Sequence, residues 1–138
     1  MSEADRCEKF FQSQAFAVIG AAKNRDKYGN KVLRCYMQHG LEVYPVNPRA
    51  CEIEGIACFA AVKDLPDTVQ SISIITPPPV TEQVVREAIA RGIKNIWMQP
   101  GAESPAAIAD CRAAGINCIA HGSCLLVHLG FNNSWMPA

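Results

Sequence analysis

The sequence predicts an α/β fold in which about five parallel strands form an open sheet with helices on both faces. Short apolar runs, typical of strands buried on both faces, alternate along the chain with longer amphipathic segments. Glycine follows three of these segments, at Gly40, Gly92 and Gly115, where helices commonly end. Strands and helices that alternate in this way form right-handed βαβ units, and such units build a parallel sheet.

The individual elements follow this pattern along the chain. The expected strands cover residues 15–20, 41–46, 71–75, 95–98 and 117–120, and the expected helices cover residues 31–40, 80–92 and 104–114. Pro45 lacks a backbone donor, so it must lie where the hydrogen-bond ladder of its strand is incomplete. Residues 53–59 show no clear period, residues 62–66 predict a brief helical turn, and residues 124–138 contain no convincing helix.

The composition predicts one domain over residues 1–138. Hydrophobic residues make up 49% of the chain and charged residues 19%, which is enough apolar material for a core. Thirteen basic and thirteen acidic residues cancel, so no net field draws the chain to nucleic acid or to an anionic membrane. No signal peptide and no membrane-spanning apolar run is evident. We therefore expect a cytoplasmic protein whose partner is a small-molecule nucleotide.

The seven cysteines are an odd number and include no Cys-x-x-Cys pair, so the sequence predicts reduced thiols and no metal site. Most are expected to be small buried hydrophobes. The three histidines, His39, His121 and His128, show no ligand spacing, and structural roles are expected for them.

The loop after the first strand has features of a phosphate site. It begins with Gly20, Ala21 and Ala22, whose small side chains let a phosphate approach the backbone. Lys23, Arg25 and Lys27 add three cations at the mouth. The spacing is not Gly-x-Gly-x-x-Gly, so the standard dinucleotide fingerprint is absent. A solvated basic loop is the alternative interpretation.

The loops after the next strands add a second set of candidates. Asn47, Pro48 and Arg49 stand where NAD-binding domains usually carry an acid, which favours a phosphorylated ribose as in CoA or NADP, although Asn47-Pro48 could simply start a turn. Thr76 and residues Pro77, Pro78 and Pro79 predict a stiff, donor-free exit suited to packing against a flat ring. A further glycine turn follows residue 98.

Several of these motifs together resemble the stand-alone CoA-binding domain family. The matching segments, between residues 12 and 128, are Val18-Ile19-Gly20-Ala21-Ala22, Tyr44-Pro45-Val46-Asn47-Pro48, Glu54-Gly55-Ile56-Ala57-Cys58-Phe59, the triple proline, Trp97-Met98-Gln99-Pro100-Gly101-Ala102 and Ala114-Gly115-Ile116. The triple proline and residues 82–90 also resemble the nucleotide-binding domain of the succinyl-CoA synthetase alpha subunit. The resemblance implies a Rossmann-like fold with coenzyme A or an acyl-CoA as ligand.

The resemblance also implies roles for individual residues. The pyrophosphate would be surrounded by Gly20, Ala21, Ala22 and Lys23, with Lys27 as a further contact. The phosphorylated ribose would lie between Asn47 and Arg49. The adenosine would be bordered by Thr76 and Pro77 to Pro79, and the pantetheine by Gln99 and Gly101. Cys124 matches a cysteine common near the end of these domains and could form a mixed disulfide with the pantetheine thiol. The family often has serine at the position of Ala22, so one hydroxyl contact is expected to be missing here.

The expected function is therefore binding of CoA without catalysis. A synthetase of the succinate type needs a second domain with a phosphorylated histidine, which this sequence does not contain. Two alternatives stay open: an NADP-binding oxidoreductase module, and a redox-responsive CoA sensor that acts through Cys124.

Overall fold

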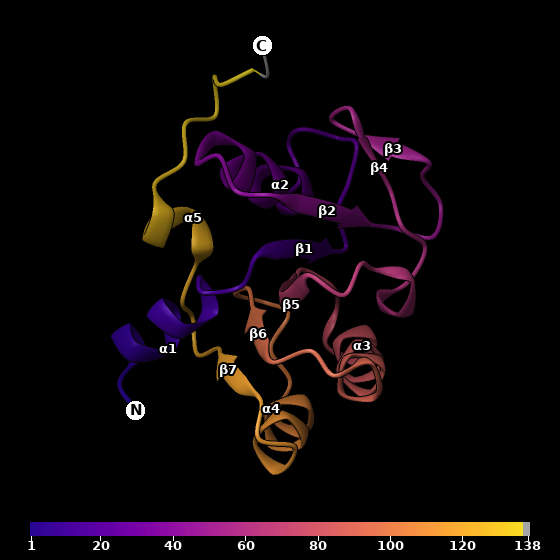
Figure 1. Ribbon diagram of the computed structural model, residues 1–138. Coiled ribbons are helices and arrows are strands. Elements are labelled where there is room, and N and C mark those ends of the chain that lie inside the picture. The colour runs from indigo at the N-terminus through magenta and orange to yellow at the C-terminus, as the bar shows by residue number, and fades with distance from the viewer. Residues whose placement is uncertain (137–138) are drawn as a thin grey trace.

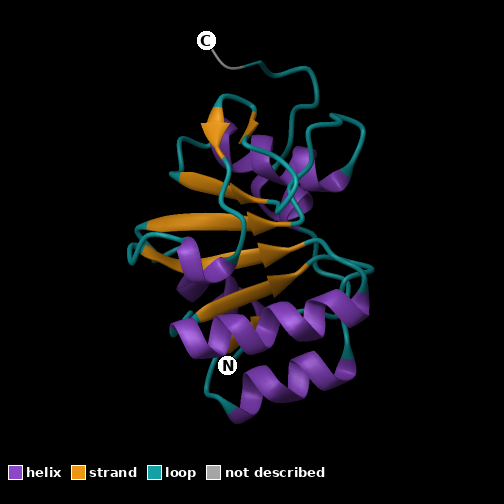
Figure 2. Ribbon diagram, turned by 90° about the vertical axis from the view of Figure 1, so that its right-hand side faces the viewer, coloured by secondary structure: helices purple, strands orange, loops and turns teal. Residues whose placement is uncertain are grey.

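A five-stranded parallel sheet forms the centre of the molecule, as the sequence predicted (Figure 1). The computed structural model describes residues 1–136. The strands of this sheet are β1 (Ala15–Ile19), β2 (Val43–Val46), β5 (Val69–Ile74), β6 (Asn95–Met98) and β7 (Asn117–Ile119), in the order β2-β1-β5-β6-β7. All neighbouring strands pair in parallel, and the arrowheads that are visible in Figure 2 point the same way, so the loops that follow the strands gather at one edge.

Helices cover both faces of the sheet. The helices are α1 (Glu3–Phe10), α2 (Tyr28–Gln38), α3 (Pro78–Arg91), α4 (Pro105–Ala113) and α5 (Leu125–Leu129), with a short 3-10 helix, η1 (Val62–Asp64). One core cluster joins the sheet to α3 and α4, and a second joins its other face to α1, α2 and α5.

Strand β1 shows why the sheet is apolar on both sides. Ala15, Ala17 and Ile19 belong to the cluster beneath α3 and α4, whereas Phe16 and Val18 belong to the opposite cluster. All five residues are buried. A strand between two helical layers therefore reads as an unbroken apolar run.

The chain reverses its direction across the sheet at β1, which has β2 on one side and β5 on the other. Ile19, the last residue of β1, is in register with Val46 of β2 and Ile74 of β5. Open α/β sheets bind ligands at such a switch point, beyond the carboxyl ends of the strands.

Two expectations about local structure were wrong. The triple proline does not make an extended exit: Pro77 caps α3, and Pro78 and Pro79 form its first turn. Proline is tolerated there because the first amides of a helix have no partner within the helix. Leu125–Leu129 forms a helix that the apolar but aperiodic C-terminal sequence did not indicate.

Two further elements had not been assigned. α1 begins with a capping box in which Ser2 and Asp5 bond each other's backbone amides. The aperiodic stretch contains a hairpin of β3 (Glu52–Ile53) and β4 (Ile56–Ala57), with Glu54 and Gly55 both at positive φ in its turn.

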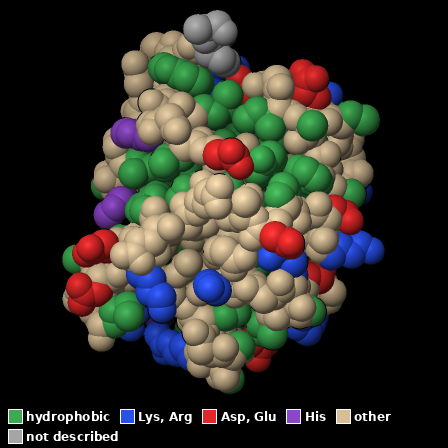
Figure 3. All heavy atoms as spheres, viewed as in Figure 1, with side chains coloured by type: hydrophobic (Ala, Val, Ile, Leu, Met, Phe, Trp, Pro, Cys, Tyr) green, Lys and Arg blue, Asp and Glu red, His purple; other side chains and the backbone are tan. Residues whose placement is uncertain are grey.

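The surface carries charges of both signs. Basic and acidic side chains both occur on the face shown in Figure 3, in keeping with a net charge of zero. Within residues 1–136, no helix has both the length and the apolar character that crossing a bilayer requires.

Candidate ligand-binding site

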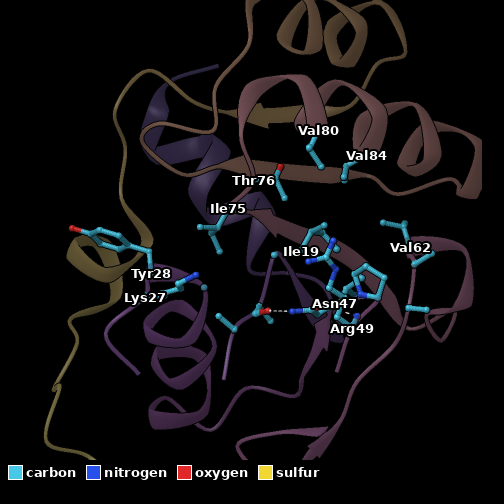
Figure 4. Close-up of a pocket in the computed structure, with 18 of the residues that line it drawn as sticks. Ile19, Lys27, Tyr28, Asn47, Arg49, Val62, Ile75, Thr76, Val80 and Val84 are labelled. Atoms are coloured by element: carbon cyan, nitrogen blue, oxygen red, sulfur yellow. Dashed lines mark hydrogen bonds between the residues drawn. The ribbon is translucent and has the colours of Figure 1, made fainter. Parts of the chain in front are cut away.

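A cavity of about 800 Å³ opens at the carboxyl ends of β1, β2 and β5 (Figure 4). Its lining comes from the β1–α2 loop, the loop after β2, the segment before η1 and the first turns of α3. The lining residues are Ile19, Gly20, Ala21, Ala22, Asp26, Lys27, Tyr28, Gly29, Val46, Asn47, Pro48, Arg49, Ala60, Ala61, Val62, Ile75, Thr76, Val80, Val84 and Glu87.

Two glycines let three backbone segments meet at the floor of this cavity. Gly20 has a φ of +91°, and a Cβ atom on it would lie 2.5 Å from the carbonyl oxygen of Ile75. A Cβ atom on Gly29 would lie 2.1 Å from the carbonyl oxygen of Gly20. Both distances are far below van der Waals contact, so the end of β1, the end of β5 and the start of α2 can approach this closely only without side chains at these positions.

The N-terminus of α2 faces the cavity without a side-chain cap. Lys27 is the N-cap residue, and its side chain accepts no hydrogen bond from the helix. Lys27 and Tyr28 are both exposed and line the cavity. The first turn of an eleven-residue helix thus offers amide donors and the positive end of the helix dipole beside a lysine.

The side chain of Asn47 links the β1–α2 loop to the loop after β2. Its Nδ2 donates to the carbonyl oxygen of Ala21 at 2.9 Å, and its Oδ1 accepts from the backbone amide of Arg49 at 2.8 Å. The second bond is an Asx turn, so the turn-forming role considered for Asn47 is present. The side chain of Arg49 is exposed at the cavity rim, and within residues 1–136 neither Arg49 nor Lys27 forms an ion pair.

Arg25 is not a free cation at the mouth. Its guanidinium donates to both carboxylate oxygens of Glu54 in the β3–β4 hairpin, at 3.2 and 3.1 Å. Burial alone would raise the pKa of Glu54, but the hydrogen bonds from Arg25 and Asn30 outweigh it and lower that pKa. Lys23 is exposed and lies outside the cavity lining. Lys27 and Arg49 are therefore the two basic residues of the lining, with Asp26 and Glu87 as its two acids.

The apolar wall of the cavity comes from residues that were not among the predicted site residues. Val62 from η1 faces Val80 and Val84 of α3 across the opening (Figure 4). Thr76 also lines the cavity, whereas Pro77, Pro78 and Pro79 are exposed outside the lining. The i, i+4 spacing of Val80 and Val84 was the available signal, because it puts both on one side of a helix.

Gln99, Gly101 and Cys124 form a separate group at the ends of β6 and β7. Gln99 is 2% exposed, and its Oε1 accepts from the amide of Leu125 at 2.9 Å while its Nε2 contacts the Cys124 sulfur at 3.4 Å. The Gly101 amide donates to Glu103 at 3.0 Å. None of the three lines the cavity. The backbone N–H of Gln99 donates to the carbonyl oxygen of Ile74, so this group adjoins the end of β5.

The structure therefore divides the fifteen residues selected from the sequence. Gly20, Ala21, Ala22, Lys27, Asn47, Pro48, Arg49 and Thr76 lie together in the cavity lining. The others lie outside it, at the exposed loop position 23, on the first turn of α3 and at the ends of β6 and β7. Their roles stay predictions.

Comparison with known proteins agrees with the family resemblance. The model of the CoA binding domain matches residues 14–129. The alpha subunit of the ADP-forming acetate–CoA ligase II of Pyrococcus furiosus is 33% identical over 88 residues, which are 63% of this chain and 19% of that protein. The ADP-forming acetate–CoA ligase of Methanocaldococcus jannaschii is 32% identical over 82 residues, 59% of this chain and 12% of that protein. The chain thus spans a fifth or less of these two relatives.

Solved structures of small proteins match over nearly their full length. A conserved hypothetical protein from Pyrococcus furiosus has 42% identity and a TM-score of 0.79, with 83% of this chain and 98% of that chain covered. A hypothetical protein from Pyrococcus horikoshii has 28% identity and a TM-score of 0.85, with 94% and 92% covered. The fold is therefore one that also occurs in other small proteins.

Proposed function

Because the chain belongs to the CoA-binding domain family, we propose that it binds coenzyme A or an acyl-CoA in the cavity at the ends of β1, β2 and β5. Binding uses the pyrophosphate and the phosphorylated ribose, and the domain has no catalytic activity of its own. The observation that carries this placement is the close approach of Gly20 and Gly29 beside the uncapped start of α2.

The floor of the cavity suits a pyrophosphate. Only glycine fits at positions 20 and 29, because a Cβ atom there would clash with the backbone. Both glycines line the cavity, so a ligand would meet the backbone without side chains at these positions. The free amides of a helix N-terminus bind phosphate oxygens, and the helix dipole adds to their attraction. Lys27 is exposed at the same end and can supply a charge-assisted hydrogen bond. Gly20, Ala21, Ala22 and Lys27 are therefore the proposed pyrophosphate contacts, with Lys23 at the outer edge of the loop.

The wall and rim suit a 3′-phosphorylated adenosine. Val62, Val80 and Val84 give an apolar slot for the adenine ring, with Thr76 at its inner end. Arg49 is the cation at the rim beyond β2, and a guanidinium matches a phosphate in geometry and charge. Asn47 acts indirectly, since its amide is already bonded to Ala21 and Arg49 and fixes both loops.

The pantetheine arm is proposed to leave the cavity along the ends of β5 and β6. The Gln99 amide bonds to Ile74, which places this strand end beside the cavity. Gly101 presents backbone without a side chain, and Cys124 lies next to Gln99. The thiol at the end of the pantetheine arm would then lie near Gln99, Gly101 and Cys124.

An NADP-binding module is the second candidate, favoured by the basic rim residue Arg49. A guanidinium after the second strand can hold a 2′-phosphate as well as a 3′-phosphate. The family match favours CoA. The ligase activity that the curated relatives are named for belongs to proteins of which this chain matches a fifth or less.

Native mass spectrometry of freshly purified protein tests the proposal directly. Purified protein incubated with equimolar CoA, acetyl-CoA, NADP and NAD should retain CoA or acetyl-CoA as the added mass. Retention of NADP or NAD in preference to both CoA species would reject the assignment. ATP, CoA and short carboxylates, incubated with the same protein, should give no acyl-CoA.

A further inference from the structure

The C-terminal segment, residues 130–136, folds back onto α2 instead of leaving the domain. The His39 Nε2 lies 2.8 Å from the carbonyl oxygen of Gly130. Gln38 and Asn132 exchange two hydrogen bonds, at 2.6 and 3.0 Å. Phe131 packs beneath the guanidinium of Arg34, 5.1 Å from the ring centroid. We call this segment the strap. It begins just after the residues that match the family, which end at residue 129. In Figure 1 it follows α5 and runs beside α2.

Arg34 is the buried anchor of the strap. It is 1% exposed, and no carboxylate in the described chain forms an ion pair with it. Its Nη1 donates to the carbonyl oxygen of Asn133 at 3.0 Å and its Nη2 to the side-chain oxygen of Asn133 at 3.1 Å. Burying a guanidinium is costly unless its donors are satisfied, so Arg34 depends on the strap for two of its bonds.

The other donors of Arg34 hold the loop that borders the cavity. Its Nη2 also donates to the carbonyl oxygen of Arg25 at 3.1 Å, and its Nε donates to Asn30 at 2.6 Å. Asn30 in turn donates to the carbonyl oxygens of Ala22 and Lys23, at 2.9 and 3.3 Å. Three carbonyl oxygens of the β1–α2 loop are therefore directed at the Arg34 and Asn30 side chains.

This arrangement fixes the direction of the loop amides. In a planar trans peptide the carbonyl and the following N–H point in opposite directions. The carbonyls of residues 22 and 23 point at Asn30, so the amides of residues 23 and 24 point away from it. These bonds hold the β1–α2 loop, which lines the cavity with Ala22 and Asp26, in one backbone conformation before an anion arrives, and pre-organisation of this kind raises affinity.

We propose that the strap is a positioning element for the pyrophosphate loop, with Arg34 as the buried residue that joins them and a contact of 2.7 Å between the Arg25 Nη1 and the Met136 sulfur as a second link. The inference rests on the proposed function and extends it, because it makes strap docking and CoA binding thermodynamically coupled. None of residues 130–136 lines the cavity, so the coupling acts through the loop conformation and not through ligand contact. Reciprocity then requires that CoA tighten the strap as the strap tightens CoA.

Two variants test the coupling against a matched control. Truncation after Leu129 removes the strap, and the double variant Gln38→Ala/Asn133→Ala loosens it while the chain stays whole. The control is Arg91→Ala, because Arg91 likewise donates to backbone carbonyls, those of Leu65, Pro66 and Val69, none of which belongs to the pyrophosphate loop or the strap. Affinity for CoA is measured by calorimetry, and thermal stability is measured in parallel.

Both strap variants should bind CoA about tenfold more weakly, within the usual range of coupling between sites. Arg91→Ala should lose stability but keep its affinity within about twofold. In the intact protein, saturating CoA should slow hydrogen exchange at the Asn132 and Ser134 amides, whose acceptors lie on Gln38 and within the strap. If the truncated chain does not fold, the CoA affinity of the double variant tests the coupling by itself.

The outcomes separate the strap from the proposed function. An intact protein that binds CoA, with strap variants of unchanged affinity or with strap exchange unaffected by CoA, overturns the strap and leaves the function standing. An intact protein that does not bind CoA overturns the function and the strap together.

Discussion

The side-chain nitrogen of Asn47 lies 2.9 Å from the carbonyl oxygen of Ala21, and this bond ties together the two loops that border the cavity. Replacing Asn47 with alanine should lower the free energy of unfolding by about 1–3 kcal/mol, because the Ala21 carbonyl and the Arg49 amide both lose a partner. Urea unfolding of both proteins measures the change.

A comparison variant is Asn47→Asp, which keeps the acceptor for Arg49 but, at neutral pH, turns a carboxylate oxygen toward the Ala21 carbonyl oxygen in place of the donor. Asn47→Asp should therefore be no more stable than Asn47→Ala. Equal stability of all three proteins would show that this side chain does not hold the loops.

Lys27→Ala should weaken CoA binding by about 1–3 kcal/mol without a comparable loss of thermal stability. Lys27 is exposed and forms no ion pair within the described chain, so the folded protein loses little when the side chain is removed. Calorimetric titration gives the affinity. Lys94→Ala, another exposed lysine but outside the cavity lining, is the matched control and should bind CoA normally.

Gly29→Ala should destabilise the protein and abolish measurable CoA binding. Alanine is favoured over glycine inside a helix by up to about 1 kcal/mol, so propensity alone predicts stabilisation. The new Cβ atom would lie 2.1 Å from the Gly20 carbonyl oxygen, and that backbone cannot move away without distorting the end of β1. The steric effect should therefore win.

The matched glycine is Gly55, which has a φ of +80°. A Cβ atom on Gly55 would meet no heavy atom within 4 Å among residues 1–136, its chain neighbours aside. Gly55→Ala should cost stability through backbone strain alone and leave CoA affinity intact. Comparable CoA affinity in Gly29→Ala and the native protein would contradict the close packing described for this loop.

Stability should fall in acid through Glu54. Its pKa is lowered in the folded protein despite burial, because Arg25 and Asn30 donate to the carboxylate. The resulting stabilisation is present above the pKa of the unfolded chain and is lost as pH falls through the lower folded value. Urea midpoints measured from about pH 6 down to about pH 3 should decline less steeply for Glu54→Gln than for the native protein. Parallel declines would show that Glu54 does not contribute.

The sheet could be predicted from sequence because burial on two faces leaves a local signal. The run from Ala15 to Ile19 is apolar throughout and stops at a glycine, which is sufficient to identify a central strand. The glycine loop and Asn47 were selected as site candidates because the carboxyl ends of parallel strands share one edge of the sheet.

Other parts of the site depended on contacts between distant residues. The sequence alone does not show that Arg25 pairs with Glu54, because twenty-nine positions separate them. The hairpin that carries Glu54 also lacks a clear hydrophobic period in the sequence. Pro78 and Pro79 were assigned to a rigid loop because proline is compatible both with an extended loop and with the first turn of a helix. In the structure α3 begins at Pro78, so the second context applies. Val62 was missed because it belongs to a single 3-10 turn.

Binding of a 3′-phosphorylated adenosine that carries a pyrophosphate is the central property proposed for this cavity, and a titration of CoA, dephospho-CoA, NADP and NAD at one ionic strength tests it most directly. CoA should bind most tightly. Dephospho-CoA should bind about tenfold more weakly, because it loses one charge-assisted contact worth about 1.4 kcal/mol, and NAD should bind more weakly still. Tighter binding of NADP or NAD than of CoA would contradict the account.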